Sequence, residues 1–138
     1  MAGMYLFDTD VITNVLKPRP AEQLIERLTH VSQKDQFIST VTVSEIVYGA
    51  MKSKRPAYHL KNLEEILLPS VNIVTFDTKA AYVCGKLRAE LEKKGLPLSL
   101  ADLEIAAISI AGNFTLITGN AKHFTRIKSL KTENWLTQ

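Results

Sequence analysis

Four oxygen-bearing side chains that lie far apart in the chain have the chemistry of a divalent-cation site: Asp8, Glu45, Asp102 and Asn120. Oxygen ligands without an accompanying set of histidines and cysteines suit Mg²⁺ or Mn²⁺ better than zinc. Carboxylates that are brought together repel one another, and a divalent cation relieves that repulsion. Such a cation can activate water and neutralise developing negative charge, so the chemistry that these residues suggest is metal-assisted hydrolysis.

Each of these residues also has an ordinary structural explanation. The stretches Thr42–Glu45 and Ser99–Asp102 match the capping box, in which a hydroxyl and an acid satisfy free backbone N–H groups at a helix start. Asp8 is a suitable N-cap for the helix that follows it, and Asn120 is a common turn residue after a glycine. Taken one at a time, the acids are better explained as caps.

Two acids inside one apolar segment favour the cluster instead. Asp102 and Glu104 interrupt a predicted helix that is otherwise apolar nearly all round and is therefore expected to be buried. An acid near a buried region is costly unless it is paired or binds a metal. A shared site accounts for this pattern, whereas independent caps do not.

Short apolar strands alternate with amphipathic helices along the chain, which predicts an α/β fold with a parallel sheet covered on both faces. Strands are expected over residues 4–7, 36–39, 71–75 and 114–118, with a short last one over 134–136. Helices are expected over residues 11–16, 20–31, 42–50, 60–67, 78–94 and 103–111. Pro20 suits the first turn of the second helix, Gly95 would cap the fifth, and Ala81 is expected on the apolar face of the fifth.

These elements would bring the polar residues to one place. Asp8 follows the first strand directly, and Glu45 lies early in the helix after the second strand. Asp102 opens the helix that leads into the fourth strand, and Asn120 comes two residues after that strand. The C-terminal ends of parallel strands share one edge, where open α/β folds bind their ligands. We therefore expect the four residues to meet at a single rim.

Length and composition fit one globular domain over residues 1–138. The chain is 46% hydrophobic and 22% charged, and its apolar runs are too short for a membrane span of roughly 20 residues. Cys84 is the only cysteine, so an internal disulfide is excluded and a reducing, cytoplasmic location is expected. The net charge of +3 permits a polyanionic partner without demanding one. The apolar faces over residues 24–31 and 60–67 exceed the needs of a small core, so one of them is expected to be a partner or dimer surface.

An ordered set of short motifs resembles the PIN-domain family and, more narrowly, the VapC-type toxins of toxin–antitoxin pairs. The resemblance spans almost the whole chain and rests on residues 6–10 (LFDTD), 39–45 (STVTVSE) with Gly49, 101–107 (ADLEIAA), and 116–120 (LITGN) with the following His123 and Phe124. It implies a PIN-like three-layer α/β/α fold with a central parallel sheet of four to five strands. It also implies Mg²⁺- or Mn²⁺-dependent endoribonuclease activity on RNA, a homodimer, and a cognate antitoxin.

The resemblance also implies roles for individual residues. Asp8, Glu45 and Asp102 match the metal-binding acids of the family, and Asn120 matches the polar residue after the last core strand. Thr9 matches a hydroxyl position with a supporting role. Lys122 and Arg126 are the basic residues nearest this site in the sequence and are expected to contact RNA phosphates.

One position departs from the family pattern. The family usually has an acid where this chain has His123, which puts a second metal position in doubt. Glu104 or Asp10 could compensate, although Glu104 is two residues from Asp102 and so points to another side of the helix. His123 itself is expected to be a loop side chain that faces the substrate channel.

Two non-catalytic alternatives stay open at this point. A receiver-like signalling domain also gathers acids at strand ends, and Asp8 with Asp10 loosely imitates its acidic pair. Asp77, near the end of the third strand, would then be the phosphoacceptor, but no lysine is clearly in place. A degenerate PIN domain that only binds its partner is the other alternative, because of His123.

Overall fold

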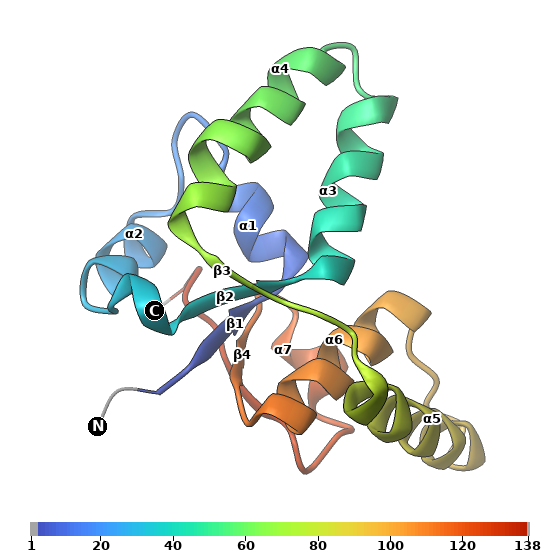
Figure 1. Ribbon diagram of the computed structural model, residues 1–138. Coiled ribbons are helices and arrows are strands. Elements are labelled where there is room, and N and C mark those ends of the chain that lie inside the picture. The colour runs from blue at the N-terminus through green and yellow to red at the C-terminus, as the bar shows by residue number, and fades with distance from the viewer. Residues whose placement is uncertain (1–2, 138) are drawn as a thin grey trace.

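The computed structural model describes residues 3–137, and at its centre is a five-stranded parallel sheet with helices on both sides (Figure 1). The sheet order is β3-β2-β1-β4-β5, and every neighbouring pair is parallel. The strands are β1 (Tyr5–Phe7), β2 (Gln36–Ser39), β3 (Asn72–Val74), β4 (Thr115–Ile117) and β5 (Lys131–Glu133). The predicted three-layer α/β/α class is confirmed.

Side chains of the central strands alternate between two apolar clusters, one on each face of the sheet. Leu6 and Leu116 belong to one cluster, while the next residues, Phe7 and Ile117, belong to the other. All four are almost completely buried. This double burial explains why the central strands read as continuous apolar runs in the sequence.

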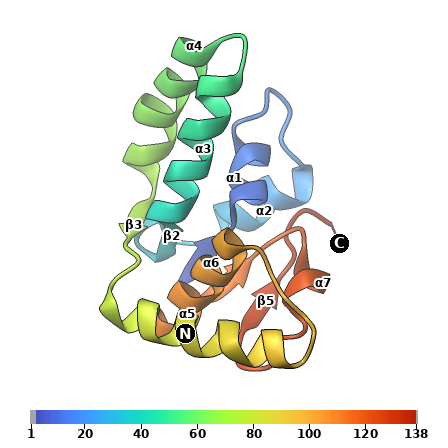
Figure 2. The same ribbon diagram turned by 90° about the vertical axis from the view of Figure 1, so that its right-hand side faces the viewer.

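The helices divide between the same two faces (Figures 1 and 2). On one face lie α5 (Thr78–Lys93), α6 (Leu100–Gly112) and α7 (Ala121–Phe124). On the other lie α1 (Thr9–Val15), α2 (Glu22–Thr29), α3 (Thr40–Lys52) and α4 (Pro56–Asn62). A π-helical turn over Leu63–Leu67 and a 3₁₀ turn over Leu68–Ser70 follow α4, and another 3₁₀ turn, Gln33–Asp35, precedes β2. The hairpin of α3 and α4 projects beyond the edge of the sheet in both views.

Helices α5 and α6 form as the sequence predicts, with one correction. Ile105 and Ala107 in α6 are fully buried, and Gly95 follows α5 at φ +68°, as a C′ residue does. Asp77 caps α5 with a side-chain bond to the Ala80 N–H. This start turns Ala80 toward the core, so Ala80 is buried rather than the predicted Ala81.

The last strand and the start of the second helix differ from the prediction. The last strand is Lys131–Glu133, not residues 134–136, because the side-chain oxygen Oδ1 of Asn134 accepts the Leu136 N–H in a turn, while Trp135 is buried. Helix α2 starts at Glu22 with Ala21 as its N-cap, so Pro20 precedes the helix instead of lying in its first turn.

The two apolar helix faces that exceeded the needs of the core are only partly covered. Leu24, Leu63 and Leu67 are buried, but Ile25 is 41% exposed and Ile66 is 57% exposed. Within residues 3–137, no helix has both the length and the apolarity that crossing a membrane requires.

Candidate active site

The strand order creates a switch point next to Asp8, the position at which open α/β sheets form a crevice. The chain passes from β1 through β2 to β3 on one side of β1 and then continues with β4 on its other side. In open α/β sheets, ligands bind at such a switch point, beyond the C-terminal ends of the strands. Asp8 leaves β1 there, and its N–H donates to the carbonyl of Ile117 at the end of β4, at 2.9 Å.

Asp8 is buried, with 5% of its surface exposed, and both of its carboxylate oxygens accept hydrogen bonds. Oδ1 accepts the Thr9 N–H at 2.8 Å, which makes Asp8 the N-cap of α1. The capping role that the sequence suggested for Asp8 is therefore present. Oδ2 accepts the hydroxyl of Thr118 at 2.8 Å. Segments 110 residues apart in the sequence therefore fix the orientation of one carboxylate.

Burial raises the pKa of Asp8 to about 6, since desolvation disfavours the charged form. The nearby charges of Asp10 and Asp102 raise it further, while the hydrogen bonds from Thr118 and Thr9 lower it. The pKa of Asp10 is also raised, mainly by burial and in part by Asp102. These three aspartates therefore interact with one another across the crevice.

Asp10 is placed in the crevice by the loop after β4. Its Oδ2 accepts the Gly119 N–H at 2.9 Å and lies 3.4 Å from the amide nitrogen of Asn120. Its other oxygen, Oδ1, is buried and has no hydrogen-bond partner among the described residues. The sequence suggests Asp10 as a possible substitute for a missing acid and as half of a receiver-like acidic pair, but does not place it among the expected site residues. Its position two residues after Asp8, on the first turn of α1, was the available signal.

Glu45 reaches the same edge through Thr9. The Thr9 hydroxyl donates to Glu45 Oε1 at 2.5 Å and lies 3.1 Å from the hydroxyl of Thr42. The capping interpretation of Glu45 is wrong, because Ser39 caps α3 and its Oγ accepts the Thr42 N–H at 3.1 Å. Glu45 is thus free of any capping role, and its exposed carboxylate is held beside Thr9.

The two acids of α6 point to different places. Asp102 lies three residues after the N-cap Ser99, whose Oγ accepts the Asp102 N–H at 3.2 Å, so the capping interpretation describes Ser99 correctly. The Asp102 charge acts on Asp8 and Asp10. The Glu104 charge acts instead on Cys84, whose thiol pKa is raised mainly by burial and secondly by Glu104. Glu104 therefore faces α5, and its expected supporting role stays a prediction.

The expected RNA-contacting residues lie around the loop after β4. Lys122 is exposed in α7, as is His123. Arg126 is partly covered and donates from Nη1 to the carbonyl of Pro97 at 2.9 Å. Lys122 is therefore the freer of the two basic side chains.

The donor set fits a hard divalent cation in part. Asp8, Asp10 and Asp102 supply oxygen atoms, and the buried, unpartnered Oδ1 of Asp10 is an atom that a cation could satisfy. However, no group of three or more His, Cys, Asp or Glu side chains among residues 3–137 has an arrangement that could hold a metal ion. The predicted convergence of Asp8, Glu45 and Asp102 on one ion is thus not present as a ready-made cage. Their roles at a bound ion stay predictions.

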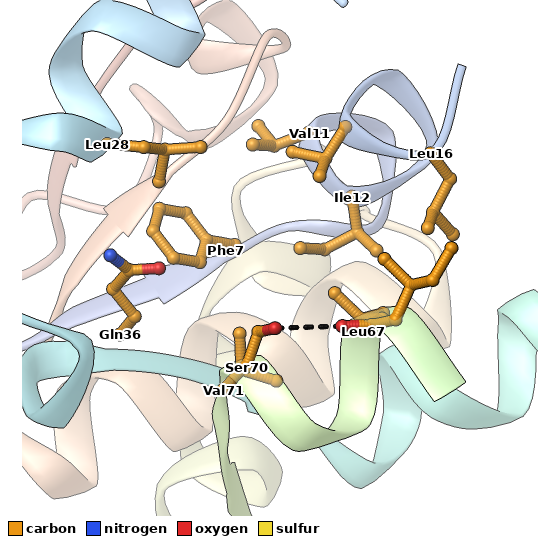
Figure 3. Close-up of a pocket in the computed structure, with 11 residues that line it drawn as sticks. Phe7, Val11, Ile12, Leu16, Leu28, Gln36, Leu67, Ser70 and Val71 are labelled. Carbon is orange, nitrogen blue, oxygen red and sulfur yellow. Dashed lines mark hydrogen bonds between the residues drawn. The ribbon is translucent and has the colours of Figure 1, made fainter. Parts of the chain in front are cut away.

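Two cavities flank α1. A cleft of about 510 Å³ has Thr9 and Glu45 in its wall, next to the aspartates. A smaller pocket of about 170 Å³ lies on the other side and is almost wholly apolar (Figure 3). Its lining includes Phe7, Leu28 and Leu67, which project toward a common space in Figure 3. The apolar pocket has no acid in its lining, so it is not a place for metal chemistry.

Comparisons with known proteins agree with this geometry. The family model described as "PIN domain" matches residues 5–130. The chain is 35% identical to "Ribonuclease VapC2" of Rickettsia felis over 96% of this chain and 98% of the relative. It is 30% identical to the "tRNA(fMet)-specific endonuclease VapC" of Shigella flexneri, over 95% and 97% of the two chains.

Solved structures show the same likeness. One is the crystal structure of VapBC2 from Rickettsia felis bound to a promoter DNA fragment, with a TM-score of 0.88 and 34% identity over 96% of this chain and 98% of that one. Another is DNA-bound VapBC from Salmonella typhimurium, with a TM-score of 0.89 and 31% identity over the same shares, 96% and 98%.

The raised pKa of Asp8 predicts a pH-dependent cost to stability in metal-free protein. The unfolded chain releases this proton near pH 3.8, whereas the native carboxyl keeps it up to about pH 6. The native state therefore binds more protons between these values, and the free energy of unfolding falls as pH rises through them. We expect urea unfolding in EDTA to show wild type losing about 2 kcal/mol between pH 4 and 7 relative to Asp8→Asn. Parallel pH profiles for the two proteins would contradict the burial of a titrating Asp8.

Gly119 is predicted to tolerate a side chain poorly because Asp10 packs directly against it. A Cβ at this position would lie 2.7 Å from Asp10 Oδ2 and 2.7 Å from Leu136 Cδ1. We expect Gly119→Ala to cost about 1–3 kcal/mol of unfolding free energy, measured by chemical denaturation. Gly85→Ala is the matched control, since a Cβ there meets nothing within 4 Å. In the middle of α5 it should be neutral or stabilising by roughly 0.5–1 kcal/mol. Equal stabilities of the two variants would show that the Gly119 loop is not tightly packed.

Proposed function

The chain belongs to the PIN-domain family, and from this premise we propose that it is a Mg²⁺- or Mn²⁺-dependent endoribonuclease that hydrolyses RNA phosphodiester bonds. We propose further that it is the toxin of a toxin–antitoxin pair. The observation that carries the proposal is the buried carboxylate of Asp8, whose pKa is raised mainly by burial and further by the charges of Asp10 and Asp102. A buried group with a strongly perturbed pKa in a crevice is typical of a functional site.

The carboxylates suit a cation that keeps much of its water. Mg²⁺ usually binds through one or two carboxylates together with waters and substrate phosphates, rather than in an all-protein cage. This mode of binding fits a site in which no cluster of three ligands is preformed among the described residues. Asp8 and Asp102 would hold the ion, with Glu45 direct or through water. When bound, the cation would supply an activated water and neutralise charge that grows on the phosphate.

The protein's own residues orient these carboxylates. Thr118 and the Thr9 N–H leave Asp8 few orientations, so little freedom is lost when a ligand binds. The Thr9 hydroxyl holds Glu45 at the rim. Asn120 lies beside Asp10 with its amide exposed, where it can donate to a substrate oxygen. Lys122 and Arg126 would attract the RNA backbone without selecting a sequence.

The receiver-like alternative has no support. Receiver domains have the strand order 2-1-3-4-5, whereas this sheet has β3-β2-β1-β4-β5. Asp77, the residue that would accept phosphate, instead caps α5. The remaining alternative is a PIN domain without catalysis, which the first experiment below separates from the proposal.

We propose an antitoxin as the protein partner and the apolar pocket beside α2 as its binding surface. Structural relatives of this chain were solved as VapBC complexes. The pocket is lined by apolar side chains of α1, α2 and the turn after α4, and Ile66 at its rim is 57% exposed. An apolar side chain of a partner would remove this surface from water. A homodimer and a cytoplasmic location, where the free thiol of Cys84 would stay reduced, complete the proposal.

Removing either of two carboxylates should abolish cleavage without unfolding the protein. We expect wild type to cut single-stranded and structured RNA with Mg²⁺ or Mn²⁺, to stop in EDTA, and to lose activity at least about 100-fold as Asp8→Asn or Asp102→Asn. Gel analysis of labelled RNA measures this, and circular dichroism checks the fold.

A thermal shift gives a readout that does not depend on activity. Mg²⁺ binds only the native state, so it should raise the Tm of wild type and raise that of Asp8→Asn less. The shift should be larger at pH 7.5 than at pH 5, where Asp8 is protonated. A shift without cleavage would identify a non-catalytic PIN domain, and wild-type cleavage by Asp8→Asn would remove this residue from the mechanism.

Charge at the rim of the apolar pocket should weaken antitoxin binding. We expect Ile66→Glu to reduce the yield of a complex formed with the protein encoded next to this gene, because a carboxylate would have to be buried there. Tyr82→Glu is the control, since Tyr82 is 70% exposed in α5 on the opposite side of the sheet. Co-purification measures the effect. An intact complex with Ile66→Glu would contradict the location, whereas failure of wild type to bind would contradict the partner itself.

A further inference from the structure

The cleft next to Glu45 extends well beyond the candidate active site. At about 510 Å³ it falls within the roughly 300–1,000 Å³ typical of ligand sites. Its inner end is formed by Thr9 and Glu45, and its outer end by Arg55, Tyr58 and His59, where α3 passes into α4. Since Thr9 and Glu45 are hydrogen bonded to each other beside Asp8, the cleft is continuous with the site of the proposed reaction.

The outer end of the cleft presents flat, stacked groups. The guanidinium carbon of Arg55 lies 3.9 Å from the centroid of the Tyr58 ring. The ring of His59 meets that of Tyr58 edge-on, with centroids 5.2 Å apart at 75°. Tyr58 nevertheless remains 45% exposed, so the core does not use this aromatic surface. Aromatic rings and arginine planes are the groups on which proteins stack unpaired RNA bases.

The charges along the cleft suit a polyanion. Lys17 and Arg55 line it as cations, and Glu45, at the inner end, is the one acid in the lining. Arg55 makes no ion pair with an acid of the described chain, so its charge is available to a ligand. Lys52 and Lys54 flank the same turn and are exposed. A protein segment would need acids or apolar side chains to match this surface, whereas a nucleotide supplies both a base and a phosphate.

Gly49 keeps the middle of the cleft open. It lies one turn after Glu45 in α3, so the two share a helix face. A Cβ built on Gly49 meets nothing within 4 Å. A side chain can therefore be added there without a clash, and on a helix it would lean back toward Glu45.

We propose that Arg55 and Tyr58 form a base-stacking subsite, which holds one unpaired base of the RNA on the side of the scissile phosphate that lies toward the α3–α4 turn. The inference rests on the proposed ribonuclease function. It adds the feature of the substrate that the protein would recognise, which is an unstacked base in a single-stranded segment. Lys17 and Arg55 contact the adjoining phosphates. His59 supports the Tyr58 ring from its edge.

An abasic scan tests the subsite directly. Single-stranded oligoribonucleotides that wild type cleaves are made with one abasic position at a time, and kcat/KM is measured for each. We expect one position near the cut to lower wild-type kcat/KM on the order of tenfold. Tyr58→Ala should lower kcat/KM for the intact RNA by a similar factor, chiefly through KM, and should no longer respond to the abasic position. Tyr58→Phe keeps the aromatic ring and should therefore still respond to the abasic position.

Two further variants sharpen the result. Gly49→Leu should fill the cleft and raise KM for RNA while the protein stays folded, as checked by its Tm. Tyr82→Ala, which removes an exposed tyrosine of α5 outside the cleft, should leave both KM and the abasic response unchanged. A change of the same size in Tyr82→Ala would overturn the specific role of Tyr58.

The outcomes separate this inference from the function on which it rests. If the abasic penalty persists unchanged in Tyr58→Ala, the subsite is overturned. The same conclusion holds if this variant keeps the abasic penalty and loses antitoxin binding. Fluorescence anisotropy with the same oligonucleotides, without divalent cation, tests the subsite independently of cleavage. Weaker binding by Tyr58→Ala but not by Tyr82→Ala would support the subsite even if wild type cuts no RNA, a result that would refute the proposed function alone. Equal binding by both variants would refute the subsite.

Discussion

The buried carboxylate of Asp8 is the constraint on which the arrangement of the site depends. Withdrawing a charge from water is unfavourable, and the neighbouring charges of Asp10 and Asp102 add to that cost. Hydrogen bonds from Thr9 and Thr118 offset part of it and hold the group in one orientation. An apolar residue would fill this position at lower cost. The molecule thus keeps an unfavourable group where its charge is useful, which is the usual signature of a site that binds a cation or performs catalysis.

The sheet and the end of the chain hold this unfavourable cluster in place. The strand order puts the switch point of the sheet between β1 and β4, and the loop after β4 supplies hydrogen-bond donors to both Asp8 and Asp10. Trp135 packs against β1, with its ring centroid 5.0 Å from that of Tyr5 and 5.7 Å from that of Phe7. Leu136 lies close to Gly119. Residues from both ends of the chain therefore meet around one loop, and apolar packing compensates for the repulsion within the site.

Helix α1 links the three surfaces to which functions are assigned. It starts at Asp8, presents Thr9 and Thr13 to the cleft, and presents Val11 and Ile12 to the apolar pocket. Leu16, just after the helix, lines both cavities. A ligand in either cavity would thus contact the segment that carries the central carboxylate. The proposed protein partner and the proposed nucleic-acid substrate would thus bind separate surfaces that share one structural element.

The sequence by itself determined the fold class, four of the five strands and the residues near the candidate site, because apolar periodicity and strand-end position are local properties. It also determined the Gly95 cap, since a left-handed residue after a helix leaves a local signal. Only the tertiary structure decided which acids lie at the candidate site and which lie elsewhere. It moved Asp10 into the crevice and turned Glu104 toward Cys84, because the partners that decide this, Gly119 and Cys84, are distant in sequence. It also replaced the predicted cap at Glu45 with a bond to Thr9, and it joined Arg55 and Tyr58 to the cleft, since side-chain contacts between separate elements leave no periodic trace in the chain.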